Sequence, residues 1–129
     1  MAKTALQLTS EERQKYQPIK AIEQRRFEKA EEIRKRRGEG YRLAQKAADL
    51  LKSEFDAEKV VLFGSLVGDS GFTLWSDIDL AAWGIPSTRF YESVAAITGM
   101  SSKFRIDLVD PDTCRPGMRE AIEQDGIEL

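Results

Sequence analysis

The chain of 129 residues contains no histidine and only one cysteine, Cys114. The absence of histidine excludes a histidine-based catalytic triad, a histidine-ligated zinc or haem site and a histidine pH switch. A metal ion would have to be held by oxygen ligands, which favours magnesium, manganese or calcium. One cysteine cannot form a disulfide within the chain, so we expect a protein of a reducing compartment.

Long apolar runs are also missing. No segment reaches the roughly 18 apolar residues of a membrane helix, and the first residues lack the apolar core of a signal peptide. Apolar residues still make up 41% of the chain, which is enough for a folded core. We expect a cytoplasmic protein without a membrane partner, built as one compact domain with an appended element.

The charge is distributed unevenly along the chain. Residues 1–55 hold 14 Lys and Arg against 9 Asp and Glu, a net charge of +5, and residues 56–129 hold 6 against 13, a net charge of −7. A basic arm can mark contact with nucleic acid or with a protein partner. Because Glu31 and Glu32 precede the short basic cluster at 34–37, a nucleic-acid-binding module that uses this helix is the least favoured interpretation.

The pattern is helical from about residue 19. Apolar side chains recur at steps of three and four residues, at Ala30, Ile33, Tyr41, Ala44, Ala48, Leu51 and Phe55. Arg37 interrupts this stripe, and Gly38 and Gly40 flank the gap. We therefore expect a well-packed helix over about 41–54 and an N-terminal helical extension over 1–40. Whether the extension contacts another chain or lies against its own domain stays open.

Strand and helix signals alternate over the rest of the chain. The expected strands cover residues 59–63, 78–83 and 104–109, and the expected helices cover about 88–98 and 116–125. This alternation predicts a domain of the α/β class over residues 41–129.

Three aspartates are the most informative residues. Asp77 and Asp79 are separated by one residue at the second strand, so both side chains point to one face of it, and Asp107 lies on the polar face of the third strand. If these strands are neighbours, three carboxylates converge. Clustered carboxylates repel one another, and a divalent cation removes that repulsion. Two cations roughly 3.5–4 Å apart could assist an in-line displacement at phosphorus.

Gly64 and Ser65 follow the first strand directly. A glycine and a serine at this point can present backbone N–H groups and a hydroxyl to a phosphate, although no P-loop motif is present. Asp77 follows Ser65 by 12 residues, on the next strand. The phosphate-binding turn and the acidic residues can therefore share one surface.

Together, the segments Leu62–Ser65, Ser76–Leu80 and Ile106–Leu108 resemble the DNA polymerase β-like nucleotidyltransferase superfamily. Within it, they are most similar to the minimal nucleotidyltransferase domains that serve as antitoxins in HEPN/MNT toxin–antitoxin pairs. The resemblance implies an α/β (α+β) fold in which helices pack on a small mixed sheet of three to four strands, here preceded by a long N-terminal helix.

The resemblance also implies the roles of the candidate site residues. Gly64 and Ser65 would bind the phosphates of a nucleoside triphosphate, and Asp77, Asp79 and Asp107 would be the catalytic residues and the ligands of a two-metal magnesium site. The implied activity moves a nucleoside monophosphate, AMP from ATP, to a hydroxyl of a protein acceptor. The implied role is that of antitoxin to a HEPN-type ribonuclease toxin, with the N-terminal helix contacting that partner or a second copy of the chain.

The chain departs from the family pattern after Ser65. Members often carry a basic residue there, whereas residues 66–68 are Leu, Val and Gly. The triphosphate charge would then be met by magnesium, by backbone N–H groups, or by Arg89, Lys103 or Arg105. This departure supports an alternative function, a catalytically weak domain that neutralises a partner toxin by binding alone.

Overall fold

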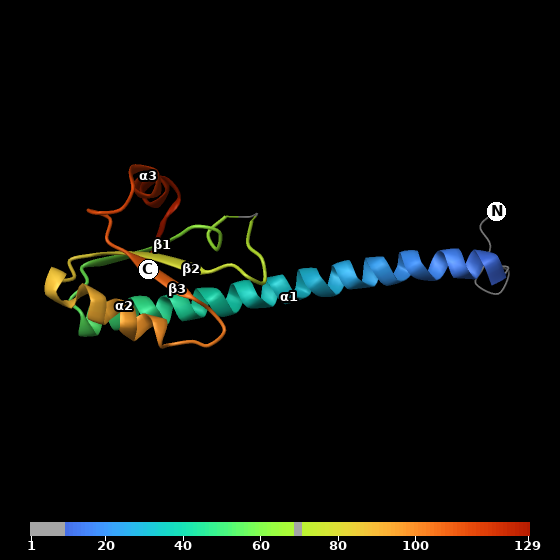
Figure 1. The fold of residues 1–129 in the computed structure, drawn as a ribbon, viewed down its shortest axis with the longest axis horizontal. Helices are drawn as coiled ribbons and strands as arrows, with labels where there is room; N and C mark the ends of the chain where they lie inside the picture. The colour runs from blue at the N-terminus through green and yellow to red at the C-terminus, as the bar shows by residue number, and fades with distance from the viewer. Residues whose placement is uncertain (1–9, 69–70) are drawn as a thin grey trace. The chain divides into compact units, whose positions relative to one another are not determined.

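The computed structural model describes residues 10–68 and 71–129, with side chains from residue 18 onward. The elements are α1 (Ser10–Glu54), β1 (Lys59–Phe63), β2 (Ile78–Trp83), η2 (Ser87–Arg89), α2 (Phe90–Thr98), β3 (Ile106–Val109), α3 (Pro116–Asp125) and β4 (Ile127–Glu128) (Figure 1). The chain divides after Arg34 into two compact units. The boundary predicted at residue 40 lies inside α1 and stays a prediction. No helix of the described ranges combines the length and apolar character that crossing a membrane requires.

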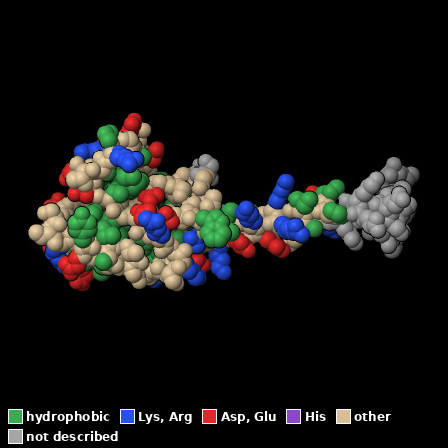
Figure 2. All heavy atoms as spheres, in the orientation of Figure 1, with side chains coloured by type: hydrophobic (Ala, Val, Ile, Leu, Met, Phe, Trp, Pro, Cys, Tyr) green, Lys and Arg blue, Asp and Glu red, His purple; other side chains and the backbone are tan. Residues whose placement is uncertain are grey.

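The segment of α1 before Lys35 is held by contacts between its own side chains. Gln24 Nε2 donates to Glu28 Oε1 at 3.1 Å, and Arg34 forms an ion pair with Glu31 at 2.6 Å. Three large apolar side chains of this segment are exposed, Ile19 by 58%, Ile22 by 47% and Phe27 by 64%. Figure 2 shows basic, acidic and apolar side chains interspersed along it.

From Lys35 onward, α1 buries one face. The buried positions follow helical spacing, at Gly40, Ala44, Ala47, Ala48 and Leu51. The stripe predicted over 41–54 is therefore buried, and it belongs to a longer helix that continues through Gly38 and Gly40. Gly40 is needed for close packing, because a Cβ atom there would lie 3.3 Å from Leu66 Cδ2.

The sheet has four strands in the order β3-β2-β1-β4. Strand β1 is antiparallel to β2 and β4, and β2 is parallel to β3. The sheet is thus mixed, as predicted. Strand β4 was not predicted, because its two residues are too few to show an alternating pattern. It follows Gly126, where the chain leaves α3 and pairs with β1.

Helices cover both faces of this sheet. Figure 1 shows α2 and the C-terminal half of α1 on one side, and α3 on the other. Alternate strand residues are buried toward the first side, namely Val60, Leu62, Ile78, Leu80, Ile106 and Leu108. On the other side, Val61, Phe63 and Ala81 pack with Ile122 of α3. Since side chains alternate along a strand, Asp79 and Asp107 lie on the α3 side.

We predict that Gly126→Ala destabilises the fold. An added Cβ atom would overlap the carbonyl oxygen of Ile122 and Cγ1 of Val61, and overpacking of this kind costs about 1–3 kcal/mol of unfolding free energy. Gly117→Ala in α3 is the matched control, because nothing lies within 4 Å of its added Cβ atom. The control should gain about 0.5–1 kcal/mol. Urea unfolding measures both, and equal midpoints for the two variants would contradict the packing argument.

Candidate functional site

Two of the three aspartates lie side by side on neighbouring strands. The parallel pairing of β2 with β3 places Asp79 opposite Asp107, so their side chains share one face. Asp77 precedes the first residue of β2, and the next residue, Ile78, donates its backbone N–H to the carbonyl oxygen of Arg105 at 2.9 Å. This hydrogen bond joins the start of β2 to the start of β3. The three aspartates lie at these two strand starts.

The electrostatics of Asp79 show that the three carboxyl groups interact. Burial, and then the negative charges of Asp107 and Asp77, raise the pKa of Asp79 from 3.8 to about 6. An isolated carboxylate at the surface would show no such rise. We call Asp77, Asp79 and Asp107 the acidic group, because the charges of the other two add to burial in raising the pKa of Asp79.

The glycine–serine turn lies directly against this acidic group. Gly64 has a φ of +82°, in the left-handed region that favours glycine, and a Cβ atom there would lie 3.2 Å from Cγ of Asp79. The backbone N–H of Val67 donates to the carbonyl oxygen of Gly64 at 3.2 Å and closes the turn, with Ser65 half-buried inside it. Glycine is required here both for the backbone conformation and for the approach to the carboxylate.

A cavity of about 410 Å³ opens beside the same turn. Gly64, Val67 and Gly68 form one wall, and Ala121 and Asp125 of α3 form the other. The volume lies within the range of small-molecule sites, roughly 300–1,000 Å³. The turn therefore borders both the Asp79 carboxylate and this cavity, whereas none of the three aspartates lines the cavity.

The donor chemistry of the site suits magnesium, since all three candidate ligands are carboxylates. The described residues nevertheless contain no group of three His, Cys, Asp or Glu arranged to hold a metal ion. Asp107 is engaged by Arg105, whose Nε lies 3.1 Å from Asp107 Oδ1. Both side chains of this ion pair are substantially exposed, by 73% and 39%, so a ligand can reach them.

The sequence offers three basic residues that could meet the phosphate charge, and the structure places them in different parts of the molecule. Arg105 is beside the acidic residues. Arg89 is engaged elsewhere, because its Nη1 donates to the carbonyl oxygen of Glu54 at 2.8 Å and its guanidinium lies 4.7 Å from the ring of Phe55. Lys103 Nζ lies 4.0 Å from a carboxylate oxygen of Glu39.

Sequence reasoning missed two residues that hold the turn. Arg37 Nη1 donates to the carbonyl oxygens of Leu66, at 3.1 Å, and Gly68, at 2.6 Å. The Tyr41 hydroxyl donates to the same carbonyl oxygen of Leu66 at 3.0 Å. The available signal was a charged residue inside an apolar helical stripe, which indicates a polar partner at that position.

Trp75 is exposed by 89% on the turn that leads to Asp77. Its backbone N–H donates to Thr73 Oγ1 at 3.2 Å, and the Thr73 N–H donates to Ser76 Oγ at 2.9 Å. The backbone of this turn is held by hydrogen bonds while the indole ring faces solvent. Trp75 therefore exposes a large aromatic surface, and it precedes Asp77 by two positions in the sequence.

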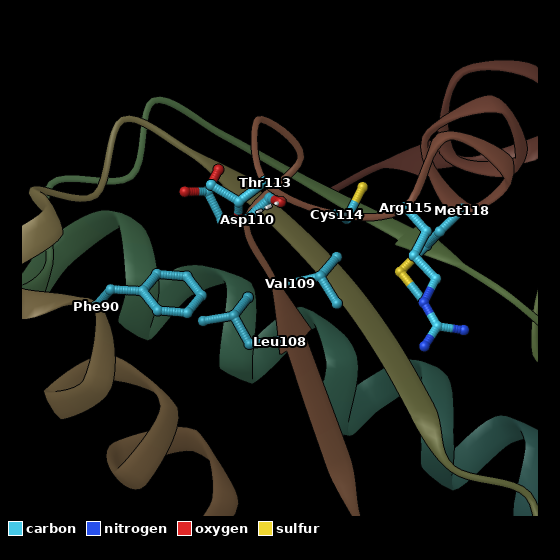
Figure 3. Close-up of a pocket in the computed structure, with 8 residues that line it drawn as sticks. All are labelled: Phe90, Leu108, Val109, Asp110, Thr113, Cys114, Arg115 and Met118. Carbon is cyan, nitrogen blue, oxygen red and sulfur yellow. Dashed lines mark hydrogen bonds between the residues drawn. The ribbon is translucent and has the colours of Figure 1, made fainter.

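A second cavity, of about 360 Å³, lies at the C-terminal end of β3 (Figure 3). Phe90 of α2 lies on one side of it, and Arg115 and Met118 from the start of α3 lie on the other. None of the predicted site residues lines this cavity. It is separate from the acidic group.

Comparisons with known proteins identify the fold. No protein-family model matches the chain, and no curated protein is significantly similar to it. Two crystal structures of mutants of the toxin–antitoxin MntA-HepT align with TM-scores of 0.51 and 0.52 and identities of 18% and 22%. Each alignment covers 66% of this chain, and 70% and 69% of the respective matched chains. A crystal structure of the toxin–antitoxin with AMP-PNP aligns with a TM-score of 0.52 and 20% identity, over 66% of this chain and 70% of that chain.

The structure and these likenesses confirm the predicted α/β (α+β) fold class, a small mixed sheet with helices packed on it and a long N-terminal helix before it. They also agree, at the level of the fold, with the resemblance to the antitoxins of toxin–antitoxin pairs.

We predict that Asp79→Asn stabilises the protein at pH 7 in the absence of metal ions. A folded-state pKa of about 6 lies above the unfolded value of 3.8, so the folded state binds more protons between these values. Stability from this group is therefore present below pH 3.8 and is lost as the pH rises through 6. Asparagine removes the charge, and we expect Tm to rise by roughly 2–4 °C at pH 7.

The rise in Tm of Asp79→Asn over the wild type should fall to zero near pH 4. Asp112→Asn, at an exposed aspartate outside the acidic group, is the control and should not reproduce this pH profile. Thermal unfolding between pH 4 and pH 7 with a chelator present measures both variants. A gain that is the same at both ends of this range would contradict ionisation of the buried Asp79 carboxyl as its cause.

Proposed function

We propose that this chain is a nucleotidyltransferase-type antitoxin of the cytoplasm, which moves AMP from ATP to a hydroxyl of a HEPN-type ribonuclease toxin. The observation that carries the proposal is the in-register placement of Asp79 opposite Asp107, with Gly64 against the Asp79 carboxylate. The shared fold of the toxin–antitoxin structures supports the partner class. The structure with AMP-PNP supports a nucleoside triphosphate as the substrate.

Each site residue has a role that its position supports. The backbone of Gly64 and the hydroxyl of Ser65 would orient the triphosphate. Asp77, Asp79 and Asp107 would hold Mg²⁺, which when bound offsets the negative charge of the phosphates. In the proposed reaction the acceptor oxygen would form a bond to the α-phosphorus, pyrophosphate would leave, and the Asp107 carboxylate would take the acceptor proton.

One observation favours a second candidate function, neutralisation by binding alone. Arg105 occupies an oxygen of Asp107, and the described residues contain no closed group of three metal ligands. A cation fixed in this place would compensate the acidic charge without any metal ion. The two functions differ in whether magnesium and nucleotide bind to the acidic group.

We predict that magnesium with ATP stabilises the protein through the acidic group. At a hundredfold excess over Kd, a ligand that binds only the folded state adds about 2.7 kcal/mol of unfolding free energy, which corresponds to a rise in Tm of roughly 8–13 °C for a chain of this size. The double variant Asp77→Asn with Asp79→Asn should lose the magnesium-dependent part of this rise. Differential scanning fluorimetry with ATP, with and without magnesium, measures it.

The comparison uses the ligand-induced shift of each protein, because Asp79→Asn changes Tm by itself. Asp112→Asn serves as the control that keeps the full shift. An equal magnesium-dependent shift in the wild type and the double variant would rule out the metal assignment and leave binding alone as the function.

The N-terminal helix is proposed as the docking element for the partner. Its segment before Lys35 exposes Ile19, Ile22 and Phe27, and exposed apolar side chains that cluster on one helix are typical of interaction surfaces. The occupant that we propose is the toxin partner, with a second copy of the chain as the competing outcome.

We predict that Ile22→Glu with Phe27→Glu abolishes co-purification with the product of the neighbouring gene. A charge placed in a desolvated contact costs several kcal/mol, whereas the fold of the second unit does not use these residues. Ala21→Glu adds the same kind of charge to an exposed position of the same helix and should retain binding. Light scattering reports dimerisation separately. Retention of the partner by the double variant would exclude this segment as the docking element.

A further inference from the structure

Two neighbouring arginines of α1 contact two different loops next to the acidic group. Arg37 reaches the turn after β1, through the hydrogen bonds of its Nη1 to the carbonyl oxygens of Leu66 and Gly68. Its guanidinium also lies 5.3 Å from the ring of Phe72, in the segment that leads to Asp77. One cation thus joins the segment after β1 to the segment before β2.

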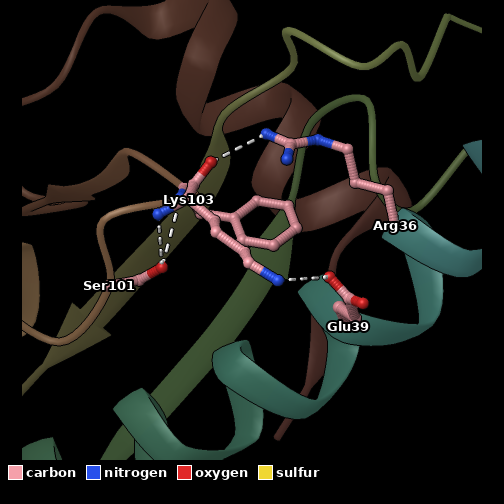
Figure 4. Close-up of polar contacts among 5 residues, drawn as sticks. Arg36, Glu39, Ser101 and Lys103 are labelled. Atoms are coloured by element: carbon pink, nitrogen blue, oxygen red, sulfur yellow. Dashed lines mark hydrogen bonds and ion pairs between the residues drawn. The ribbon is translucent and has the colours of Figure 1, made fainter.

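Arg36 reaches the loop before β3 (Figure 4). Its Nη2 donates to the carbonyl oxygen of Lys103 at 3.1 Å, and its guanidinium lies 4.0 Å from the ring centre of Phe104. Ser101 Oγ accepts the backbone N–H groups of both of these loop residues. Arg36 Nε is buried and has no partner among the described residues, so this guanidinium is held mainly by the ring and by one carbonyl.

Helix geometry explains how adjacent residues serve separate loops. Successive side chains on an α-helix diverge by about 100°, because 3.6 residues make one turn. Gly40, one turn further along α1, lets the helix approach both loops closely, since a Cβ atom there would lie 3.3 Å from Leu66 and 3.5 Å from Phe104. The helix is therefore fitted against both loops at the level of the two arginines.

The turn that carries Gly64 and Ser65 contains no basic residue of its own. Arg37 brings a positive charge to that turn from a part of the sequence 29 residues away from Leu66. Hydrogen bonds from a charged donor are roughly twice as strong as neutral ones. Tyr41 adds a second donor to the same carbonyl, so two side chains of α1 hold the backbone of the turn.

We propose that Arg37, assisted by Tyr41, is the positioning residue of the Gly64–Ser65 turn and supplies the positive charge that residues 66–68 lack. Arg36 holds the loop before β3 through the Lys103 carbonyl oxygen, and that loop has basic residues of its own. The inference rests on the proposed function for its phosphate ligand, but the positioning of the turn does not depend on any ligand.

The first experiment tests positioning in the ligand-free protein. Amide hydrogen exchange of Val67, whose N–H bonds Gly64 within the turn, should become at least tenfold faster in Arg37→Ala and clearly faster in Tyr41→Phe. Arg42→Ala, an exposed arginine of the same helix, is the matched control and should leave this exchange unchanged. Unchanged exchange in both Arg37→Ala and Tyr41→Phe overturns the positioning role. If Arg37→Ala fails to fold, Tyr41→Phe decides alone.

The second experiment tests the supply of charge, with inorganic tripolyphosphate and magnesium as the probe. Its Kd should rise at least tenfold in Arg37→Ala, and Arg37→Lys, which keeps the charge but not the fork of donors, should recover part of the loss. With ATP, the loss should appear in KM more than in kcat. Unchanged tripolyphosphate binding in Arg37→Ala overturns the charge role even if exchange is faster. A wild type that does not bind the probe overturns the proposed function and the charge role together, while the exchange result still decides positioning.

Discussion

The parallel pairing of β2 with β3 is the interaction on which the rest of the structure depends. Each strand holds one aspartate between two buried apolar residues, and the register sets Asp79 opposite Asp107. The same pairing therefore builds the apolar layer against α1 and α2 and places like charges next to each other on the opposite face. Burial of the apolar side chains outweighs this repulsion, because it extends over several residues of each strand.

Two glycines let the backbone come close to neighbouring side chains, and these contacts connect the site to the sheet. Gly64 brings the turn after β1 against the Asp79 carboxylate, and Gly40 brings α1 against Leu66 and Phe104. The contacts that bury the core are thus also the contacts that set the distance between the turn and the acidic residues. A change of packing at the α1 surface would be felt at the site, since packed interiors transmit displacement.

The strands at 59–63 and 78–83 were predicted with their observed ends, because each is a short apolar run bounded by a glycine or polar residues. The third strand is shorter than predicted and begins at Ile106, since Phe104 is instead covered by the Arg36 guanidinium. The glycines of α1 suggested a weak point in the helix. They lie within one continuous helix, where Gly40 is buried by tertiary contacts that no helix propensity describes. Among the candidate site residues, the sequence pattern predicted the shared face of Asp79 and Asp107, and their roles stay predictions.

The sequence by itself determined the local features: the helical stripe, the alternation of the strands, and the glycine after β1. These features depend on residues within one or two turns or strand repeats, so periodicity reveals them. Tertiary structure alone decided that β2 pairs with β3, that Arg105 engages Asp107, and that Arg37 holds the glycine–serine turn. The contacts of Arg37 and Arg36 span 29 and 67 residues of chain, and such partners are selected by the packing of whole elements, which no local pattern encodes.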